Sequence, residues 1–148
     1  MLGVSFEDAR AYATWRTARE GRGICRLPTS TEMAYAGMGD RRCSFSWGNR
    51  FDQRFANTRF SRAIARPERV ASHPRDESPV WVFDTCGNAL EWVTDGYDES
   101  RNLRRACGES WGQARTDTLA VGGGIGMTDG TSSGETGSRL IWDEDGDL

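Results

Sequence analysis

Two stretches near the N-terminus combine the apolar spacing of an amphipathic helix with the residues that begin one. The first follows Ser5, a favourable N-cap residue, and Asp8 stands three positions later, as in a capping box. We expect a helix from Ser5 to about Ala18 that ends at residues 21–23, because glycine readily adopts the left-handed backbone of a helix end. Trp15 is expected to anchor this helix against the second one.

The second helical pattern begins at Thr29. Thr29 and Glu32 form another capping box, which predicts a helix from Thr29 to about Gly37. Between the two helices, residues 24–27 form a short stretch that we expect to be extended, since Pro28 follows it and disfavours helical backbone before it.

The middle of the chain, residues 41–79, has no sustained periodicity. Pro67, Pro74 and Pro79 lack backbone donors and restrict the residues before them, so long helices or strands are excluded there. We therefore predict irregular loop. The single histidine, His73, lies in this segment, and we expect it to make hydrogen bonds near the surface rather than to act in catalysis.

The C-terminal half has short apolar runs separated by turn residues. Residues 91–94 are expected to be a short extended segment, with a turn at 95–96. Residues 122–137 hold seven glycines in sixteen positions and predict a long flexible loop. Residues 140–142 are expected to form a final strand, followed by an acidic tail at 143–148.

The composition is typical of a small domain that is rich in aromatic residues and glycine. The chain has 148 residues, of which 36% are hydrophobic, and six Trp, six Phe and three Tyr must supply much of the buried area. We expect one domain over residues 1–148. Every basic residue other than the histidine is arginine, which excludes lysine Schiff-base chemistry. One histidine cannot supply a multi-histidine metal site within one chain.

The four cysteines lie far apart in the sequence and form no C-x-x-C motif. They could form up to two disulfides in three pairings, or none. The sequence shows no signal peptide and no apolar run long enough to span a membrane. We therefore expect reduced cysteines, a cytoplasmic location and no membrane partner. The cysteines are Cys25, Cys43, Cys86 and Cys107.

Charge is distributed unevenly along the chain. Residues 41–75 hold nine arginines and two acids, whereas residues 76–148 hold five arginines and fifteen acids. Arginines with phenylalanines between them also occur in nucleic-acid-binding proteins. We favour the alternative that these arginines pair with acids of the C-terminal half, and expect no nucleic-acid partner. The interleaved phenylalanines are Phe45, Phe51, Phe55 and Phe60.

Residues 84–92 (DTCGNALEW) place two acids, Asp84 and Glu91, around a turn made by Gly87 and Asn88. Glycine adopts positive φ freely, and asparagine tolerates it better than most residues. Such a turn can direct backbone carbonyls and flanking carboxylates at one point, which suits a hard cation such as calcium. The alternative is an ordinary buried turn in which one acid is solvated and the other caps backbone amides.

This segment resembles the Asn/Asp-x-x-Gly-Asn-x-x-Glu-Trp signature of the formylglycine-generating-enzyme (sulfatase-modifying factor) family. Four other segments resemble motifs of that family in the same order: residues 4–9 (VSFEDA), 26–32 (RLPTSTE), 46–49 (SWGN) with 56–57, and 137–140 (GSRL). The resemblance implies an α+β fold, a variant of the C-type-lectin fold with two short helices, small antiparallel strands and much irregular loop. The family domain usually begins with strands upstream of the first motif. We expect the apolar surface that such strands cover to be exposed here or covered by a partner.

The resemblance also implies structural calcium. In the family, one calcium site uses two side chains and two backbone carbonyls of the turn motif, and all four positions are present here. These candidate ligands are Asp84, Gly87, Ala89 and Glu91. For the other calcium site of the family, Asn57 and the Thr58 carbonyl match, but the remaining acid is not identified.

The catalytic part of the family pattern is altered. The family's oxidase binds copper through two cysteines that follow a "GGSW" segment, and soft thiolates are what Cu(I) requires. Here residues 112–118 contain no cysteine, and Cys107 lies before the corresponding segment. One alternative is that Cys107 and Cys86 form a substitute pair of copper ligands. The other is that each is simply a small buried residue. We therefore expect neither copper nor a catalytic residue.

Retained scaffold motifs and a changed active-site segment favour a non-catalytic domain that binds a protein or a small molecule. Such a domain would display residues 112–136 as its ligand surface, as in sensor modules or the variable proteins of diversity-generating retroelements. The alternatives are a copper-dependent formylglycine-generating oxidoreductase acting on sulfatase cysteine, and a degenerate domain without a ligand. The candidate ligand-binding residues are Trp111, Gln113, Arg115 and Asp117.

Overall fold

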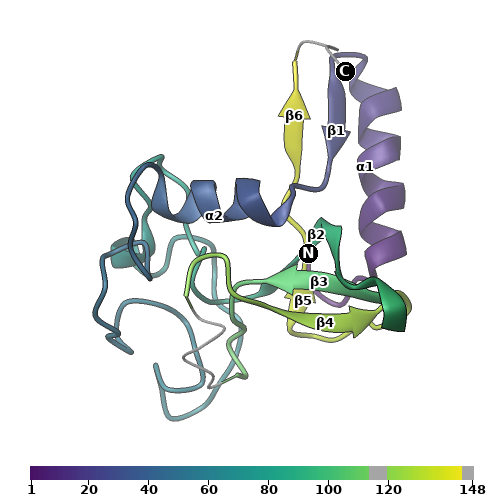
Figure 1. The fold of residues 1–148 in the computed structure, drawn as a ribbon. Coiled ribbons are helices and arrows are strands. Elements are labelled where there is room, and N and C mark those ends of the chain that lie inside the picture. The colour runs from purple at the N-terminus through teal and green to yellow at the C-terminus, as the bar shows by residue number, and fades with distance from the viewer. Residues whose placement is uncertain (114–119, 145–148) are drawn as a thin grey trace.

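The structure is a computed structural model that describes residues 1–113 and 120–144. It has the expected α+β fold, with two short helices, small sheets and long irregular connections (Figure 1). In chain order the elements are α1 (Phe6–Glu20), β1 (Ile24–Arg26), α2 (Ser30–Met38), the 3-10 helix η1 (Pro74–Asp76), β2 (Leu90–Asp98), the 3-10 helix η2 (Glu99–Arg101), β3 (Leu103–Cys107), β4 (Gly124–Thr128), β5 (Thr136–Gly137) and β6 (Ile141–Asp143).

Both α-helices begin at the capping boxes that the sequence predicts. In α1, the Ser5 hydroxyl accepts a hydrogen bond from the Asp8 amide at 3.1 Å, and the Ser5 amide donates to the Asp8 carboxylate at 3.0 Å. In α2, Thr29 and Glu32 exchange the corresponding pair of bonds. Gly21 ends α1 with a φ of 61°, in the left-handed region. The two predicted helices are therefore confirmed.

Trp15 does not anchor one helix against the other, so that expectation is wrong. The buried face of α1 is formed by Phe6, Ala9 and Ala13, and the helix packs beside β1. Trp15 comes two residues after Ala13, about 200° further around the helix, so its side chain projects from the opposite face. It is 48% exposed and stacks on Tyr12 with ring centroids 5.6 Å apart.

The main sheet has the strand order β4-β3-β2-β5, in which only the β2–β5 pair is parallel. The predicted extended segment 91–94 is part of β2, but the predicted turn at 95–96 is wrong because the strand continues to Asp98. The register between β2 and β3 shifts on both sides of Gly96. A glycine within a strand often marks such a bulge, so the turn signal at Gly96 reflects a bulge instead.

The prediction that segment 122–137 is one long flexible loop is wrong, because the segment contains β4 and the whole of β5. Two of its glycines let β4 lie close to the neighbouring strands. A Cβ on Gly124 would lie 2.6 Å from the Ala106 carbonyl oxygen, and one on Gly126 would lie 2.4 Å from the Tyr97 ring. Side chains at these positions would force β4 away from β3 and β2, so glycine here permits strand pairing.

The core joins α1 to the main sheet. Trp92 on β2 is fully buried and meets Phe6 of α1 edge to face, with ring centroids 5.9 Å apart. Its indole N–H donates to the Val4 carbonyl at 2.9 Å, so the ring is both packed and hydrogen-bonded. Leu27 and Leu90 complete the same buried cluster.

A second sheet consists of the two strands β1 and β6, and ion pairs connect it to the start of α2. Arg26 on β1 donates to Glu32 at 2.9 and 2.8 Å, and to Asp143 at 2.6 and 3.1 Å. The hydrogen bonds from Arg26 lower the pKa of Glu32 to about 2. Asp95 of β2 accepts from the Ser30 amide at 2.6 Å and adds a second acid, beside Glu32, at the α2 N-terminus. The predicted last strand is confirmed as β6, and Asp143 belongs to it rather than to the acidic tail.

The segment 41–83 is irregular apart from η1, as predicted, and lies at the opposite end of the molecule from α1 (Figure 1). Its arginines do not pair with acids of the C-terminal half among the residues that the structure describes, so that expectation is wrong there. The ion pairs in which residues 41–75 take part there are Arg54–Asp52, Arg62–Glu68 and His73–Glu68. Each is formed within the segment, because a chain without regular structure brings its own side chains together locally.

All four cysteines are unbridged in the structure. Cys25, Cys86 and Cys107 are buried and Cys43 is partly buried. Neither helix in the described part of the chain has the length and hydropathy that crossing a bilayer requires.

Candidate functional site

The turn of residues 84–91 forms one wall of a cavity of about 310 Å³. All four predicted calcium ligands line it: Asp84, Gly87, Ala89 and Glu91. The opposite side comes from residues 137–139, which lie beside the turn because β5 pairs with the start of β2. Glu68 and Val70 of the irregular segment also line the cavity. The fold therefore brings together motifs that lie far apart in the sequence.

Gly87 and Asn88 shape the turn for different reasons. A Cβ on Gly87 would lie 2.8 Å from the Asn57 carbonyl oxygen, so glycine is needed for the backbone at residue 57 to pack this closely against the turn. Asn88 has a φ of 73°, which asparagine tolerates better than most residues. Asp84 has a φ of 58°, and the structure around the turn must hold this less favourable conformation.

The Asn88 side chain fastens the turn to the irregular segment. Its Oδ1 accepts from Asn57 Nδ2 and from the Glu68 amide, both at 3.0 Å, and its Nδ2 donates to the Glu68 carbonyl at 3.2 Å. The Asn88 amide also donates to the Asn57 carbonyl at 2.8 Å. Sequence reasoning identified Asn88 only as a turn former. Its role as the link between residues 57 and 68 depends on contacts across long sequence separations.

Glu91 faces an arginine across the cavity. Arg139 donates to both carboxylate oxygens of Glu91, at 3.0 and 3.1 Å, and to the Phe83 carbonyl at 2.9 Å. This paired, forked geometry is the strong form of an ion pair. Arg139 thus links the segment after β5 to both ends of the turn motif.

Asp84 is nearly buried, and its Oδ2 accepts from the Ala71 amide at 3.0 Å. Burial raises the pKa of Asp84 above its ordinary value, although the Ala71 bond and the charges of Arg139 and His73 act in the opposite direction. Ala71 itself has a φ of 63°. Two residues with unfavourable backbone conformations therefore meet at the wall of the cavity.

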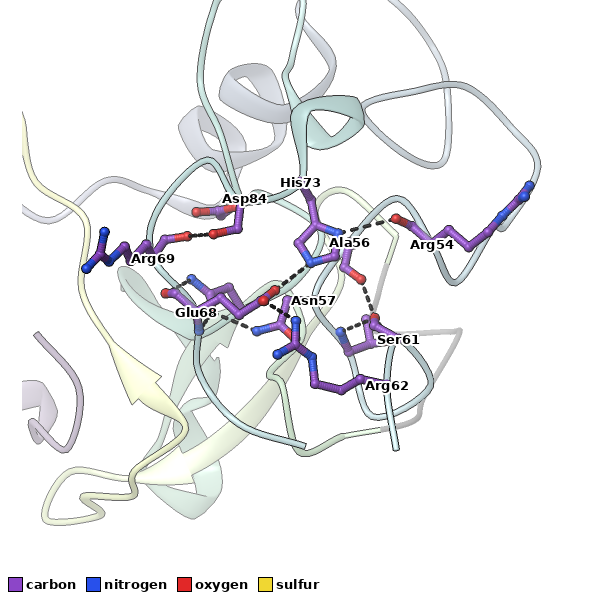
Figure 2. Close-up of polar contacts among 12 residues, drawn as sticks. Arg54, Ala56, Asn57, Ser61, Arg62, Glu68, Arg69, His73 and Asp84 are labelled. Carbon is purple, nitrogen blue, oxygen red and sulfur yellow. Dashed lines mark hydrogen bonds and ion pairs between the residues drawn. The ribbon is translucent and has the colours of Figure 1, made fainter. Parts of the chain in front are cut away.

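A polar cluster lies behind the turn (Figure 2). Glu68 pairs with Arg62, and its Oε2 lies 2.7 Å from His73 Nε2. Burial opposes ionisation of Glu68, but the hydrogen bonds to Arg62 and His73 outweigh it and lower the pKa of Glu68. The other ring nitrogen of His73 lies 3.3 Å from the Arg54 carbonyl. His73 is therefore a hydrogen-bonding residue, as predicted.

The donor chemistry of the turn fits a hard cation, because the four predicted ligands offer carboxylate and carbonyl oxygens around one cavity. Glu91 is shared with Arg139, so a cation there would compete with a guanidinium. Asn57 Oδ1, which matches the family's other calcium site, is buried and has no hydrogen-bond partner. Glu68, whose amide shares the Asn88 Oδ1 acceptor with Asn57 Nδ2, has its carboxylate held by Arg62 and His73. Within residues 1–113 and 120–144, no three histidine, cysteine or acidic side chains gather in a group able to hold a metal.

The two candidate copper thiols are core residues. Cys86 packs with Phe45 and Ala56, whereas Cys107 packs with Met33 and Val93. Burial raises the pKa of each thiol to about 12. Thiols of this kind stay protonated at neutral pH, and copper binds thiolates. The two thiols of the Cys86–Cys107 alternative thus lie in two different buried clusters.

Of the predicted ligand surface, residues 112–136, the structure describes 112–113 and 120–136, and residues 124–128 of it form β4 rather than a loop. The Trp111 amide donates to the Asn88 carbonyl at 3.3 Å, and the Gln113 carbonyl accepts from the Arg59 amide at 3.0 Å. On the other side, the Val121 amide donates to the Ser44 carbonyl at 2.8 Å. The other two predicted residues, Arg115 and Asp117, lie outside the described residues. The described ends are thus fastened to the turn and to the irregular segment.

Glu135 was missed by sequence reasoning. Its carboxylate accepts a hydrogen bond from the Ser110 hydroxyl, and it packs so closely on Gly112 that a Cβ there would lie 2.4 Å from Oε1. Nothing in the local sequence of Glu135 indicates this contact, because its partners lie far away along the chain.

Comparisons with known proteins agree with this geometry. Residues 1–144 match the family described as Sulfatase-modifying factor enzyme 1-like domain. The curated protein "Inactive C-alpha-formylglycine-generating enzyme 2" from Bos taurus is 29% identical over 122 residues, which cover 75% of this chain and 38% of that protein. The chain thus spans well under half of this relative.

Three solved structures share the fold. PvdO from Pseudomonas aeruginosa has a TM-score of 0.81 at 20% identity, with 94% of this chain and 60% of that chain covered. CarF has a TM-score of 0.83 at 19% identity, with 97% and 67% covered. Treponema denticola variable protein 1 has a TM-score of 0.81 at 17% identity, with 95% and 69% covered. The family match over residues 1–144 shows that the chain belongs to the sulfatase-modifying factor enzyme 1-like family.

Proposed function

We propose that this chain is a non-catalytic domain that binds a protein or small-molecule ligand through residues 112–136. The observation that carries the proposal is the placement of the thiols. The two cysteines nearest in sequence to the family's catalytic segment, Cys86 and Cys107, are buried in two separate hydrophobic clusters. A scaffold that has kept its motifs without accessible thiolates can still position a ligand surface.

Two comparisons support this proposal. The Bos taurus relative is named as inactive, and one structural neighbour is named a variable protein. In the variable-protein version, side chains of the displayed segment change while the frame stays constant. The anchored residues on either side, Gln113 and Val121, are placed suitably for that role.

The catalytic alternative can be tested with the family's reaction. Purified protein is incubated with a Cys-x-Pro-x-Arg peptide and Cu(I), and formylglycine is sought by mass spectrometry. We expect no product. Turnover that a Cys107→Ala change abolishes would overturn the proposal.

The display role has its own test. On this proposal the side chains of Trp111, Gln113, Arg115 and Asp117 serve the ligand rather than the frame, so varying them together should change the free energy of unfolding by no more than about 1 kcal/mol. Thermal unfolding of a small library measures this. Loss of folding in most members would show that these residues hold the frame and do not form a variable surface.

We further propose that the turn binds calcium as a structural ion, with Asp84, Gly87, Ala89 and Glu91 as its ligands. The ion would supply positive charge among carboxylates that little secondary structure supports. Metal analysis of the purified protein and thermal unfolding with calcium or EGTA test this. We expect bound calcium and a lower melting temperature in EGTA. An unchanged melting temperature with no metal found would remove calcium from the proposal.

A further inference from the structure

Five aromatic rings in the irregular segment form a continuous series that leads from the core to the surface. Phe45 is buried, whereas Phe51 and Phe60 at the far end are 39% and 45% exposed. Successive ring centroids are 5.1 to 6.4 Å apart. The series runs Phe60, Phe51, Phe45, Trp47 and Phe55. Because the inner rings are packed, the exposed rings are held in fixed positions.

Arginines occur at both ends of the ring series. At one end, the guanidinium groups of Arg54 and Arg75 lie over the Phe55 ring, at 5.9 and 5.6 Å from its centroid. Arg50 and Arg59 directly precede the two exposed phenylalanines and are themselves exposed. We name the exposed residues along this series the aromatic–arginine face: Phe51, Phe60, Arg50, Arg54, Arg59 and Arg75.

Little negative charge offsets this face. Residues 41–75 hold only two acids, of which Asp52 pairs with Arg54 and Glu68 pairs with Arg62 and His73. Arg50, Arg59 and Arg75 form no ion pair among the residues that the structure describes. The reason for expecting no nucleic-acid partner was pairing with the C-terminal acids, and that pairing is not found there.

We propose that the aromatic–arginine face binds single-stranded nucleic acid. Exposed phenylalanine rings offer flat surfaces on which unpaired bases stack, and guanidinium groups pair with phosphates in a forked geometry. An acidic protein would satisfy the arginines but has no general need for the two exposed rings. Duplex DNA is a poorer fit, because this segment has neither an α-helix nor a strand pair to enter a groove.

The acidic remainder of the chain does not prevent such binding. The net charge of the whole chain is −3, but the basic segment lies at the end of the molecule away from α1 (Figure 1). At physiological salt the Debye length is about 8 Å, so acids farther away than that are largely screened. Local charge therefore governs the encounter with a phosphate chain.

The experiment is fluorescence anisotropy with labelled oligo(dT) and oligo(U) of about 15 nucleotides, close to the site size of small single-strand binders. We expect binding that weakens steeply between about 50 and 200 mM salt. The double variant Phe51→Ala/Phe60→Ala should bind about tenfold more weakly, since each stacked base contributes substantially. The double variant Arg50→Gln/Arg59→Gln should lower the salt slope by about 0.7 for each phosphate that is no longer neutralised.

The control is a second exposed cluster of rings and arginine on α1. The triple variant Tyr12→Ala/Trp15→Ala/Arg19→Gln removes the stacked rings and the guanidinium over Trp15 and should bind like the unmodified protein. No binding at about 50 mM salt, or an equal loss in the control, would overturn the proposal. If heparin competes fully and the phenylalanine variant binds normally, the face attracts any polyanion and the proposal is also wrong. Should that variant not fold, the exposed arginine variant still decides the question.

Discussion

The two halves of this molecule are held together by different forces. In the helix-and-sheet half, strand ladders and capped helices satisfy the backbone, and buried rings such as Trp92 and Phe6 supply the packing. In the irregular half, side-chain hydrogen bonds connect the segments of the chain. Asn88 and Asp76, for example, bond to backbone or side-chain groups of residues far away in the sequence. The candidate site lies where the halves meet.

This difference predicts which substitutions should destabilise each half. Packing depends on volume, so the regular half should respond mainly to large-to-small substitutions. Hydrogen bonds of buried polar groups depend on atom type and charge, so the irregular half should respond to nearly isosteric changes and to pH. Substitutions at Trp92, Asn88, Asp76 and Glu32 test this contrast.

Trp92→Ala should have the largest effect. The ring is fully buried and its loss leaves a cavity between α1 and the main sheet, which costs about 3 to 5 kcal/mol. Denaturant unfolding measures this change. Trp15→Ala is the matched control: that ring is 48% exposed, and its loss should cost less than about 1 kcal/mol. Similar costs at both positions would mean that packing does not dominate the regular half.

Asn88→Ala should lower the free energy of unfolding by about 3 kcal/mol, because its side chain makes three hydrogen bonds to Asn57 and Glu68. Asn102→Ala controls for backbone strain, since Asn102 also has positive φ, at 53°, but is exposed. We expect a loss of about 1 kcal/mol there, from strain alone. Equal losses in the two variants would mean that backbone strain, and not the side-chain hydrogen bonds of Asn88, accounts for the loss of stability.

Asp76 should make the irregular half less stable as pH rises. Its carboxylate is buried and accepts from Ser46, at 2.6 Å, and from the Cys86 amide, at 3.2 Å. Burial is the main cause that raises the pKa of Asp76 to about 6. The folded state then holds its proton more tightly than the unfolded state, so stability falls as pH rises from about 4 to 6, by at most about 3 kcal/mol.

The measurement is denaturant unfolding of the protein and of Asp76→Asn across this pH range. The asparagine variant cannot ionise, so its unfolding free energy should lack that part of the pH dependence. Parallel curves for the two proteins would show that Asp76 is not the group responsible.

Glu32 should give the smallest effect, of opposite sign. Its pKa is lowered to about 2 by Arg26, so its stabilising contribution is present above its ordinary pKa and is lost as pH falls through about 2. The pair is partly solvated, so Glu32→Gln should cost no more than about 1 kcal/mol at neutral pH. Acid unfolding of the two proteins compares them, and a larger loss in the variant at low pH than at neutral pH would contradict this assignment.

Short-range signals explain which predictions succeeded. The capping boxes at Ser5 and Thr29 lie within four residues of the groups that they satisfy, so the helices follow from adjacent sequence. The turn motif at 84–91 is likewise local in its backbone. By contrast, the glycines of 122–137 are ambiguous in isolation, since glycine serves a flexible loop and a closely packed strand equally well.

The sequence by itself determined the two helices, the irregular middle, the family motifs and the set of oxygen donors in the turn. Only the tertiary structure decided that β4 pairs with β3, that Arg139 reaches Glu91, and that the arginines of the middle do not reach the C-terminal acids among the described residues. The physical reason is the sequence separation over which each kind of interaction acts. Capping and turn formation depend on neighbours in the chain, whereas strand pairing, burial and ion pairing depend on which distant segments the folded core brings within a few ångströms.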